Sequence, residues 1–338
     1  MKIFITGVAG FIGFHLTKAC LKKGYSVLGL DNLNDYYDKN LKLARLIEIK
    51  KSSGYENFEF FQADLEDRNQ LKNIFKTRNI KKVIHLAAQA GVRYSINNPY
   101  PYFQSNLVGF GNILECCRDA NIENFIFASS SSVYGLNDNA PFSEEYNVDH
   151  PISLYAATKK SNELMAHSYC HLYGIPTIGL RFFTVYGPWG RPDMALYLFT
   201  KLILEGREIE VYGGGELKRD FTYIDDVVKS LLLLINKPAC PDEKFLNSNP
   251  NPGSSKAPYK IFNIGNSQPV TVNSLINYLE KALGIKARKK FLDIQPGDVN
   301  LTSSNCKALE DWIEYKPDTP LEEGVRKFVA WYRNYFRL

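Results

Sequence analysis

Short apolar runs alternate with longer amphipathic segments along the first half of the chain. The apolar runs predict β-strands at Ile3–Thr6, Ser26–Leu30, Phe58–Gln62, Lys82–Leu86, Asn124–Ala128 and Thr177–Arg181. The segments between them have the three- and four-residue apolar spacing of helices, as at Phe11–Lys23, Asp67–Arg78, Phe103–Ala120 and Leu154–Tyr173. Because a parallel sheet is buried on both faces, near-continuous apolar strands that alternate with helices predict an α/β fold with a doubly wound parallel sheet.

The regular alternation ends after Arg181. Gly and Pro clusters at 187–192 and 213–215 predict long loops, and helical spacing returns at Val272–Leu283 and Leu321–Phe336. Late returns to the sheet are predicted at Ile224–Asn236 and Ile261–Ile264. We therefore expect a large domain and a smaller mixed α/β substrate-binding lobe. Their predicted ranges are 1–180 for the domain (with returns near 222–236 and 259–266), 181–221 and 267–338 for the lobe, and 237–258 for a surface insertion rich in Pro, Asn and Ser.

Composition and charge narrow the class of protein. With 45% hydrophobic and 23% charged residues and a net charge of +5, the chain resembles an ordinary globular protein. No dense basic block suggests a nucleic-acid or membrane-surface partner, and no apolar stretch is long enough to span a membrane. The six cysteines show no zinc-ligand spacing, so we expect no metal site. A reducing, cytoplasmic location is the expectation.

A glycine-rich turn, Gly7-Val8-Ala9-Gly10-Phe11-Ile12-Gly13, joins the first predicted strand to the first predicted helix. In this context its glycines allow a tight turn, close approach of a pyrophosphate, and close packing of helix on strand. A glycine-rich turn without a ligand is the alternative. Asp31 argues against that alternative, because it ends the second strand 18 residues after Gly13, where a carboxylate can accept from both ribose hydroxyls. With no Arg or Lys just after Asp31, a Rossmann-type domain that binds NAD rather than NADP is predicted.

Tyr155 and Lys159 lie one helical turn apart on one predicted helix face. A tyrosine has a reference pKa of about 10, so a neighbouring lysine cation and an oxidised nicotinamide are expected to lower its pKa into a useful range for a base. A solvated pair is the default reading of this spacing taken alone. Here the pair follows a strand that runs into Ala128-Ser129-Ser130-Ser131-Ser132, which places hydroxyls where parallel sheets bind ligands.

Together these motifs resemble the extended short-chain dehydrogenases/reductases across nearly the whole chain. Within that group the chain resembles the NAD-dependent sugar-nucleotide epimerases, and most closely the UDP-glucuronate 4-epimerases. Beyond the motifs above, the resemblance rests on His85–Ser95, Ser105–Leu107, Thr184, Gly187–Met194 and Lys218–Asp226. It implies Tyr155 as base, Lys159 as its partner, and Ser130 as the hydroxyl that hydrogen-bonds the reacting oxygen. The implied NAD contacts, in addition to Tyr155 and Lys159, are Gly7, Gly10, Phe11, Ile12, Gly13, Asp31, Asn32, Asp64, Leu65, Leu86, Ala87, Ala88 and Asn106. For Asp64, placed to meet the adenine, an ordinary helix N-cap is the alternative.

The resemblance also narrows the reaction. Similar 4,6-dehydratases carry Asp-Glu, and similar UDP-glucuronate decarboxylases carry Glu, at the positions of Ser131 and Ser132. Without an acid there, removal of the C5 proton and elimination lack their agent. The expected reaction is a redox-neutral inversion at C4 that turns UDP-glucuronate into UDP-galacturonate through a 4-keto sugar, for polysaccharide biosynthesis. By resemblance, the enzyme is expected to be a homodimer.

The substrate contacts implied by the resemblance involve both lobes. Arg191 would clamp the sugar carboxylate with help from Thr184, and Arg219 would bind the diphosphate. Asp298, in the run Gln295–Asp298, would lie near the uridine ribose. Arg93 could approach the sugar, although the sequence favours a salt bridge in its loop. The alternatives are an Arg191 that is solvated or paired with Asp193, and an Arg219 paired with Asp220 or Glu216.

Two other functions stay open at this point. One is a 4-epimerase for UDP-glucose or UDP-N-acetylhexosamine, in which Arg191 would hold a phosphate or a loop. The other is a non-catalytic sensor of NAD or a nucleotide sugar, against which the complete set of Ser130, Tyr155 and Lys159 argues.

Overall fold

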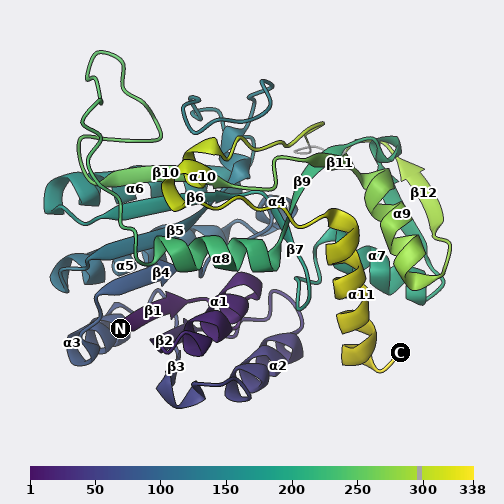
Figure 1. Ribbon diagram of the computed structural model, residues 1–338, viewed down its shortest axis with the longest axis horizontal. Coiled ribbons are helices and arrows are strands. Elements are labelled where there is room, and N and C mark those ends of the chain that lie inside the picture. Colours follow the sequence, from purple (N-terminus) through teal and green to yellow (C-terminus); the bar gives the residue numbers. More distant parts are fainter. Residues whose placement is uncertain (295–298) are drawn as a thin grey trace.

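The computed structural model describes residues 1–294 and 299–338 (Figure 1). Its centre is a sheet of seven strands, in which every neighbouring pair is parallel. In spatial order the strands are β10 (Tyr259–Ile264), β6 (Thr177–Phe182), β5 (Asn124–Ser130), β4 (Lys82–His85), β1 (Lys2–Thr6), β2 (Ser26–Asp31) and β3 (Phe58–Gln62). This confirms the predicted α/β fold with a Rossmann-type parallel sheet.

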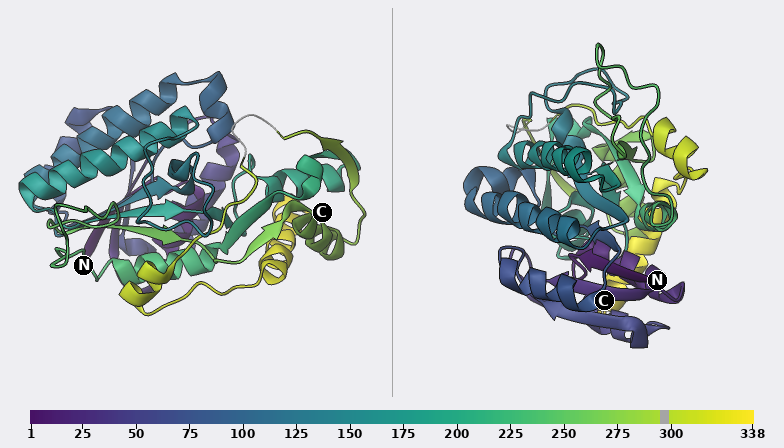
Figure 2. Two further views of the ribbon diagram at one scale, coloured as in Figure 1. Left: turned by 90° about the horizontal axis from the view of Figure 1, so that it is seen from above. Right: turned by 90° about the vertical axis from the view of Figure 1, so that its left-hand side faces the viewer.

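The side chains of β1 show why helices cover both faces of the sheet. Ile3 and Ile5 belong to one apolar cluster and Phe4 to another, because successive side chains of a strand point to opposite faces. Figure 2 shows helices on either side of the strands. The first cluster lies under α1 (Phe11–Lys22), α2 (Lys39–Lys50) and α8 (Ile224–Leu234), and the second under α3 (Arg68–Arg78), α5 (Phe110–Asp119) and α6 (Leu154–Tyr173).

The order of the strands fixes where a ligand can bind. From β1 the chain proceeds to β2 and β3 on one side, and then crosses to β4, β5 and β6 on the other. Loops at the carboxyl ends of β1 and β4 therefore diverge and leave a crevice between them. The glycine turn after β1 and the serines that end β5 open at this edge of the sheet.

The helices and strands predicted for the first half are present, but one predicted helix is partly a π-helix. The segment Phe103–Ala120 divides into a π-helical stretch, η2 (Tyr102–Gly109), and α5. Gly109 lies where a Cβ would come within 2.6 Å of the Leu65 side chain, so the wider turn packs closely against the loop after β3. Shorter elements were not predicted: α4 (Val92–Asn97) and two short 3₁₀ turns, η1 (Tyr55–Asn57) and η3 (Ser131–Tyr134).

Of the two late returns, Ile261–Ile264 is a strand within β10, whereas Ile224–Asn236 is largely the helix α8. The buried residues Val227, Val228, Leu231 and Leu234 have helical spacing, and α8 packs beside α1. The segment therefore covers one face of the sheet as a helix, and it does not add a hydrogen-bonded strand to that sheet.

A smaller lobe lies at one end of the sheet (Figure 1). It contains a three-stranded sheet of β11 (Pro269–Thr271), β9 (Lys218–Tyr223) and β7 (Thr184–Tyr186), and a parallel pair of β12 (Arg288–Leu292) and β8 (Glu208–Tyr212). The remaining elements there are η4 (Gly213–Gly215), α7 (Ala195–Leu204), α9 (Val272–Leu283) and α11 (Leu321–Phe336). By contrast, α10 (Lys307–Ile313) contacts the strand β10 of the large sheet and the helix α8, which covers that sheet. The division into domains at the predicted residues stays a prediction.

The insertion at 237–258 consists of turns and bends. It is tied to itself by Ser254, whose hydroxyl donates to Asp242, and to the loop before α6 by Asn251, which donates to Glu145. In the described ranges, the helices are all too short or too polar to cross a bilayer. The same residues contain no group of three or more His, Cys, Asp or Glu side chains that could hold a metal ion.

Candidate active site

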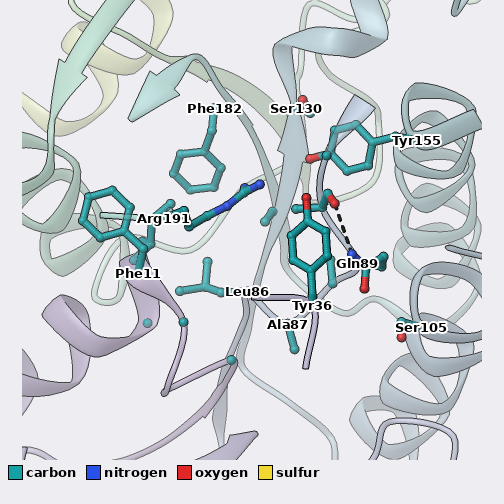
Figure 3. A pocket seen from close by; sticks show the side chains of 18 of the residues that line it. Phe11, Tyr36, Leu86, Ala87, Gln89, Ser105, Ser130, Tyr155, Phe182 and Arg191 are labelled. Carbon is teal, nitrogen blue, oxygen red and sulfur yellow. Dashed lines mark hydrogen bonds between the residues drawn. The ribbon is translucent and has the colours of Figure 1, made fainter. Parts of the chain in front are cut away.

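A cavity of about 440 Å³ opens at the carboxyl ends of β1, β2, β4 and β5 (Figure 3). That volume is within the usual range of small-molecule sites. The predicted residues that line it are Gly7, Gly10, Phe11, Ile12, Gly13, Asp31, Asn32, Asp64, Leu65, Leu86, Ala87, Ala88, Ser130, Tyr155, Lys159, Thr184 and Arg191. Residues from seven segments far apart in the sequence thus meet in one pocket.

The glycine turn has the geometry that a pyrophosphate requires. Gly7 has a φ of +76°, and a Cβ on it would lie 2.9 Å from the backbone nitrogen of Ala87. A Cβ on Gly13 would overlap the carbonyl oxygen of Gly7. Within the described part of the chain, no side chain caps the first turn of α1, whose residues Phe11, Ile12 and Gly13 line the cavity, so its N–H groups are left for a ligand. This cradle fits the pyrophosphate of a dinucleotide.

Asp31 is held rigidly at the end of β2. Its carboxylate accepts from the backbone N–H of Ala9 at 3.0 Å and of Leu33 at 2.9 Å. Burial raises the pKa of this carboxyl, while the N–H of Leu33, the charge of Lys42 and the N–H of Ala9 oppose the rise. Lys42 also lines the cavity, where its Nζ donates to the backbone carbonyl of Asn34 at 2.7 Å. The sequence analysis missed Lys42, because only the fold brings α2 back over the end of β2.

Asp64 is not the N-cap of the following helix. Asp67 caps α3, and its side chain accepts from the N–H of Gln70. Asp64 instead accepts from the side-chain amide of Asn32 at 2.9 Å and lines the cavity. The alternative of a helix cap is therefore wrong, and the loops after β2 and β3 are joined at the cavity.

Asn106 lies behind the cavity wall. Its side chain accepts from the N–H of Gln89 at 2.8 Å, donates to the carbonyl of Gln89 at 3.0 Å, and donates to Thr158 at 3.1 Å. These bonds fix the loop after β4, which itself lines the pocket. Direct contact of Asn106 with NAD stays a prediction.

The predicted catalytic side chains converge on one point. Ser153 caps the N-terminus of α6, which places Tyr155 and Lys159 in its first two turns. Figure 3 shows the hydroxyl of Tyr155 pointing towards Ser130, the last residue of β5. Lys159 is buried, and its Nζ donates to the carbonyl of Ala128 on the same strand at 2.9 Å. Helix and strand are thereby locked together beneath the phenol.

The surroundings of Tyr155 shift the pKa of its phenol in both directions. Burial raises the pKa of its phenol, while the Ser130 hydroxyl and the Arg191 guanidinium lower it and the Asp193 carboxylate raises it. Burial also lowers the pKa of Lys159 to about 8. In the chain without cofactor, loss of solvent outweighs the neighbouring charges. The expected lowering of the Tyr155 pKa includes the charge of an oxidised nicotinamide and stays a prediction.

Arg191 was predicted to bind the substrate or, alternatively, to pair with Asp193, and its position in the structure is compatible with both. It lines the cavity, and it also forms a two-point ion pair with Asp193: Nε to Oδ1 at 3.0 Å and Nη2 to Oδ2 at 2.5 Å. Tyr36, which the sequence analysis missed, donates its hydroxyl to Asp193 at 3.0 Å. Figure 3 shows the Arg191 side chain extending into the space between Phe182, Tyr36 and Tyr155.

Two other predicted substrate residues, Arg93 and Arg219, are not among the described residues that line the cavity. The Arg93 guanidinium lies over the ring of Tyr212 at 4.8 Å, and Arg219 donates to the carbonyl of Lys218 at 2.9 Å. Asp298, with the whole run Gln295–Asp298, falls outside the described residues.

Asp220, one of the suggested partners of Arg219, is fully buried and has other partners. Its carboxylate accepts from the backbone N–H of Asn266, Ser267 and Ser304, and from the Ser304 hydroxyl. Asp220 therefore joins β9 to two loops of the smaller lobe. Arg219 directly precedes Asp220 on β9.

The chain is similar in sequence and in structure to one family of known proteins. The sequence profile of the NAD dependent epimerase/dehydratase family matches residues 3–265. The chain is 55% identical over 337 residues to Protein CapI of Staphylococcus aureus, with 100% of both chains covered. It is 47% identical over 343 residues to UDP-glucuronate 4-epimerase 1 of Arabidopsis thaliana, with 99% of this chain and 77% of that protein covered. The crystal structure of UDP-glucuronic acid 4-epimerase from Bacillus cereus, in complex with UDP-glucuronic acid and NAD, superposes with a TM-score of 0.87. That match has 33% identity and covers 99% of this chain and 100% of the other.

Proposed function

The chain belongs to the NAD dependent epimerase/dehydratase family, and from that premise we propose that it inverts C4 of UDP-glucuronate to give UDP-galacturonate. At the coarser level, the chain is an NAD-dependent UDP-sugar 4-epimerase. The finer part of the proposal is the carboxylated sugar. The observation that carries it is Arg191, a guanidinium in the wall of the cavity that also contains Tyr155 and Ser130.

The catalytic residues of the chain handle the proton of the C4 hydroxyl. Tyr155 in its phenolate form accepts this proton, and the Ser130 hydroxyl donates a hydrogen bond to the same oxygen. Lys159 has a pKa of about 8, so most molecules carry its positive charge at neutral pH, one helical turn from the phenol. When bound, NAD supplies the acceptor and later the donor of the C4 hydride. Once the hydride has come back to the other face of C4, Tyr155 returns the proton to the C4 oxygen, so the configuration is inverted and no net oxidation occurs.

Ser131 and Ser132 support epimerisation over elimination. Both line the cavity beside Ser130, and the Ser130 and Ser132 hydroxyl oxygens are 3.1 Å apart. A serine hydroxyl is too weak an acid or base to remove a C5 proton and expel a hydroxyl group at neutral pH. Elimination from a 4-keto sugar held here therefore lacks its acid and base, and return of the hydride is favoured over elimination.

We also propose a homodimer, formed through η2 and α6. These two elements contact each other, and their outer surface exposes Phe103, Val108, Leu164 and Leu172. Large apolar side chains that gather on one helical surface are typical of a protein interface. Leu164→Glu should convert the dimer to a monomer in light scattering coupled to gel filtration. A wild-type monomer would contradict the proposal.

The proposed reaction is tested by incubating the purified protein separately with UDP-glucuronate and UDP-glucose, without added cofactor. Chromatography then resolves UDP-galacturonate, UDP-xylose, UDP-galactose and 4-keto products. The proposal predicts UDP-galacturonate as the product and a much higher kcat/KM for UDP-glucuronate than for UDP-glucose. Preference for UDP-glucose would favour the neutral-sugar epimerase, and no turnover of any UDP-sugar would favour a sensor.

A further inference from the structure

The ion pair of Arg191 with Asp193 uses only one edge of the guanidinium. Within the described residues, the hydrogen bonds of Arg191 go through Nε and Nη2, both to the carboxylate of Asp193. A guanidinium has five N–H donors, so Nη1 and the second N–H of Nη2 form another edge that can hold a carboxylate by two parallel bonds. The pair with Asp193 is therefore compatible with a second carboxylate on the same arginine.

Asp193 is itself anchored from the opposite wall of the cavity. The Tyr36 hydroxyl donates to Oδ2 of Asp193 at 3.0 Å, and the Tyr36 ring lies 6.0 Å from the Arg191 guanidinium carbon. Tyr36 follows β2 in the large domain, whereas Asp193 lies 157 residues later, in the loop after β7. The contact joins the cofactor side of the pocket to the substrate side.

The position of Tyr36 is fixed in turn by its neighbours. Its ring packs on Tyr94 with centroids 4.8 Å apart. Gly91 has a φ of +104°, and a Cβ on it would overlap the Tyr36 hydroxyl. The chain leaves room for this phenol by having no side chain at position 91. Such close support is what a side chain needs to orient another group accurately.

The charges of the pair are consistent with a permanently ionised link. Burial favours the neutral acid, but the charge and hydrogen bond of Arg191, together with the Tyr36 hydroxyl, outweigh burial and lower the pKa of Asp193. The side chains of Arg191 and Asp193 are 24% and 31% exposed, so neither is simply solvated. An arginine with one edge already engaged loses less conformational freedom when a second carboxylate binds.

We propose that Asp193 and Tyr36 are positioning residues that orient Arg191, so that its second edge holds the carboxylate of the sugar acid. This inference rests on the proposed function. Its consequence concerns the 4-keto intermediate, which is a β-keto acid. When its carboxylate turns perpendicular to the carbonyl plane, the C5–C6 bond can break. The electron pair of that bond then forms the enolate of the C4 ketone, carbon dioxide leaves, and C5 takes a proton from water. A fixed Arg191 keeps the carboxylate out of that orientation.

The test compares Asp193→Asn and Tyr36→Phe with the wild type. Asp193→Asn keeps the size of the side chain and removes its charge, so KM for UDP-glucuronate should rise on the order of tenfold, with a smaller change in kcat. A 4-keto pentose product and carbon dioxide should become detectable. Tyr36→Phe should raise KM by about threefold, because one neutral donor is lost. Since Tyr36 acts through Asp193, the double variant should resemble Asp193→Asn alone.

The matched control is Glu205→Gln, which makes the same chemical change in an exposed ion pair with Arg207 and should leave both KM and the product ratio unchanged. Additive effects of Tyr36→Phe and Asp193→Asn, or a wild-type KM and product ratio in Asp193→Asn, would overturn the proposal. If Asp193→Asn fails to fold by circular dichroism, Tyr36→Phe decides alone: a wild-type KM and product ratio would overturn the proposal. A wild type inactive on UDP-glucuronate contradicts the proposed function itself, which is a different result.

Discussion

The two ends of the cavity are built by different means. At the cofactor end the wall is largely backbone, from the turn at Gly7–Gly13 and the strand end at Leu86–Ala88, with the buried side-chain carboxylate of Asp31 beside them. At the substrate end the wall consists of side chains on loops, above all Arg191 and Tyr36, which are both bonded to Asp193. The first end is formed by local turns, whereas the second depends on contacts between residues more than 150 positions apart.

This difference corresponds to two tasks, binding of the dinucleotide, which the family members have in common, and recognition of the sugar, in which they differ. A pyrophosphate is recognised by N–H groups and by the absence of side chains, so few substitutions are tolerated there. A sugar substituent is recognised by side chains at the mouth of the fold, which loops can exchange without disturbing the sheet. We therefore expect changes at the cofactor end to affect every substrate, and changes at the substrate end to affect mainly sugar acids.

The largest effect is expected at Tyr155, where the two ends meet. Tyr155→Phe removes the base and should lower kcat on the order of 10³-fold, with bound NAD retained. Tyr169→Phe is the matched control, because it removes a phenolic hydroxyl from the same helix, where that group donates to Glu115. Turnover within tenfold of the wild type would exclude Tyr155 as the base.

A smaller and substrate-dependent effect is expected at Arg191. Arg191→Ala should lower kcat/KM for UDP-glucuronate by roughly tenfold to a hundredfold, equal to about 1.5–3 kcal/mol for a lost charged contact. Any residual turnover of UDP-glucose should change much less, since that sugar has no carboxylate. Equal losses on both substrates would contradict the division of the cavity into two ends.

At the cofactor end, Gly13→Ala should affect all substrates alike. The added methyl group overlaps the carbonyl oxygen of Gly7, and relief of such overpacking costs about 1–3 kcal/mol, or roughly five- to a hundredfold in NAD affinity. The measurement is the NAD content of the purified protein. Gly111→Ala is the control, because its Cβ would meet only the end of Met165 at 3.4 Å. Full NAD content in Gly13→Ala would show that the turn does not hold the pyrophosphate as proposed.

The smallest expected effect is a shift in the pH profile of kcat/KM, which reports the pKa of the base in the free enzyme. The groups that face Tyr155 are Ser130 from β5, Tyr102 from η2, Lys159 from its own helix, and Arg191 with Asp193 from the loop after β7. Asp193 raises the pKa of Tyr155 and Arg191 lowers it. Asp193→Asn should therefore move the acidic limb to lower pH, and Arg191→Gln should move it to higher pH. Shifts in the same direction would contradict this electrostatic account.

The sequence indicated which residues meet at the cofactor end of the cavity because their signals are local. The strand, glycines and helix at 1–23 are consecutive in the chain, and Asp31 stands at a fixed distance from them. Tyr155 and Lys159 are predictable for the same reason, since one helical turn separates them. Arg191 was placed by resemblance, and its partner Asp193 by closeness in sequence.

Other features could not be predicted because they arise only when the chain folds. Tyr36 and Lys42 reach the pocket through the loop after β2 and through α2, and no pattern in the sequence marks them as facing inward. The strands of the smaller lobe, such as β7 with three residues, are too short for periodicity to distinguish them from loops. The raised pKa of Tyr155 results from burial, which depends on the whole pocket.

The central claim is that C4 of a sugar acid is inverted by removal and return of the same hydride. It is tested most directly with UDP-glucuronate that carries deuterium at C4, incubated in ordinary water without added cofactor and followed by nuclear magnetic resonance. The account predicts UDP-galacturonate that retains the deuterium at C4. Loss of the label to solvent, accumulation of reduced cofactor with a stable ketone, or a product without the carboxylate would contradict it.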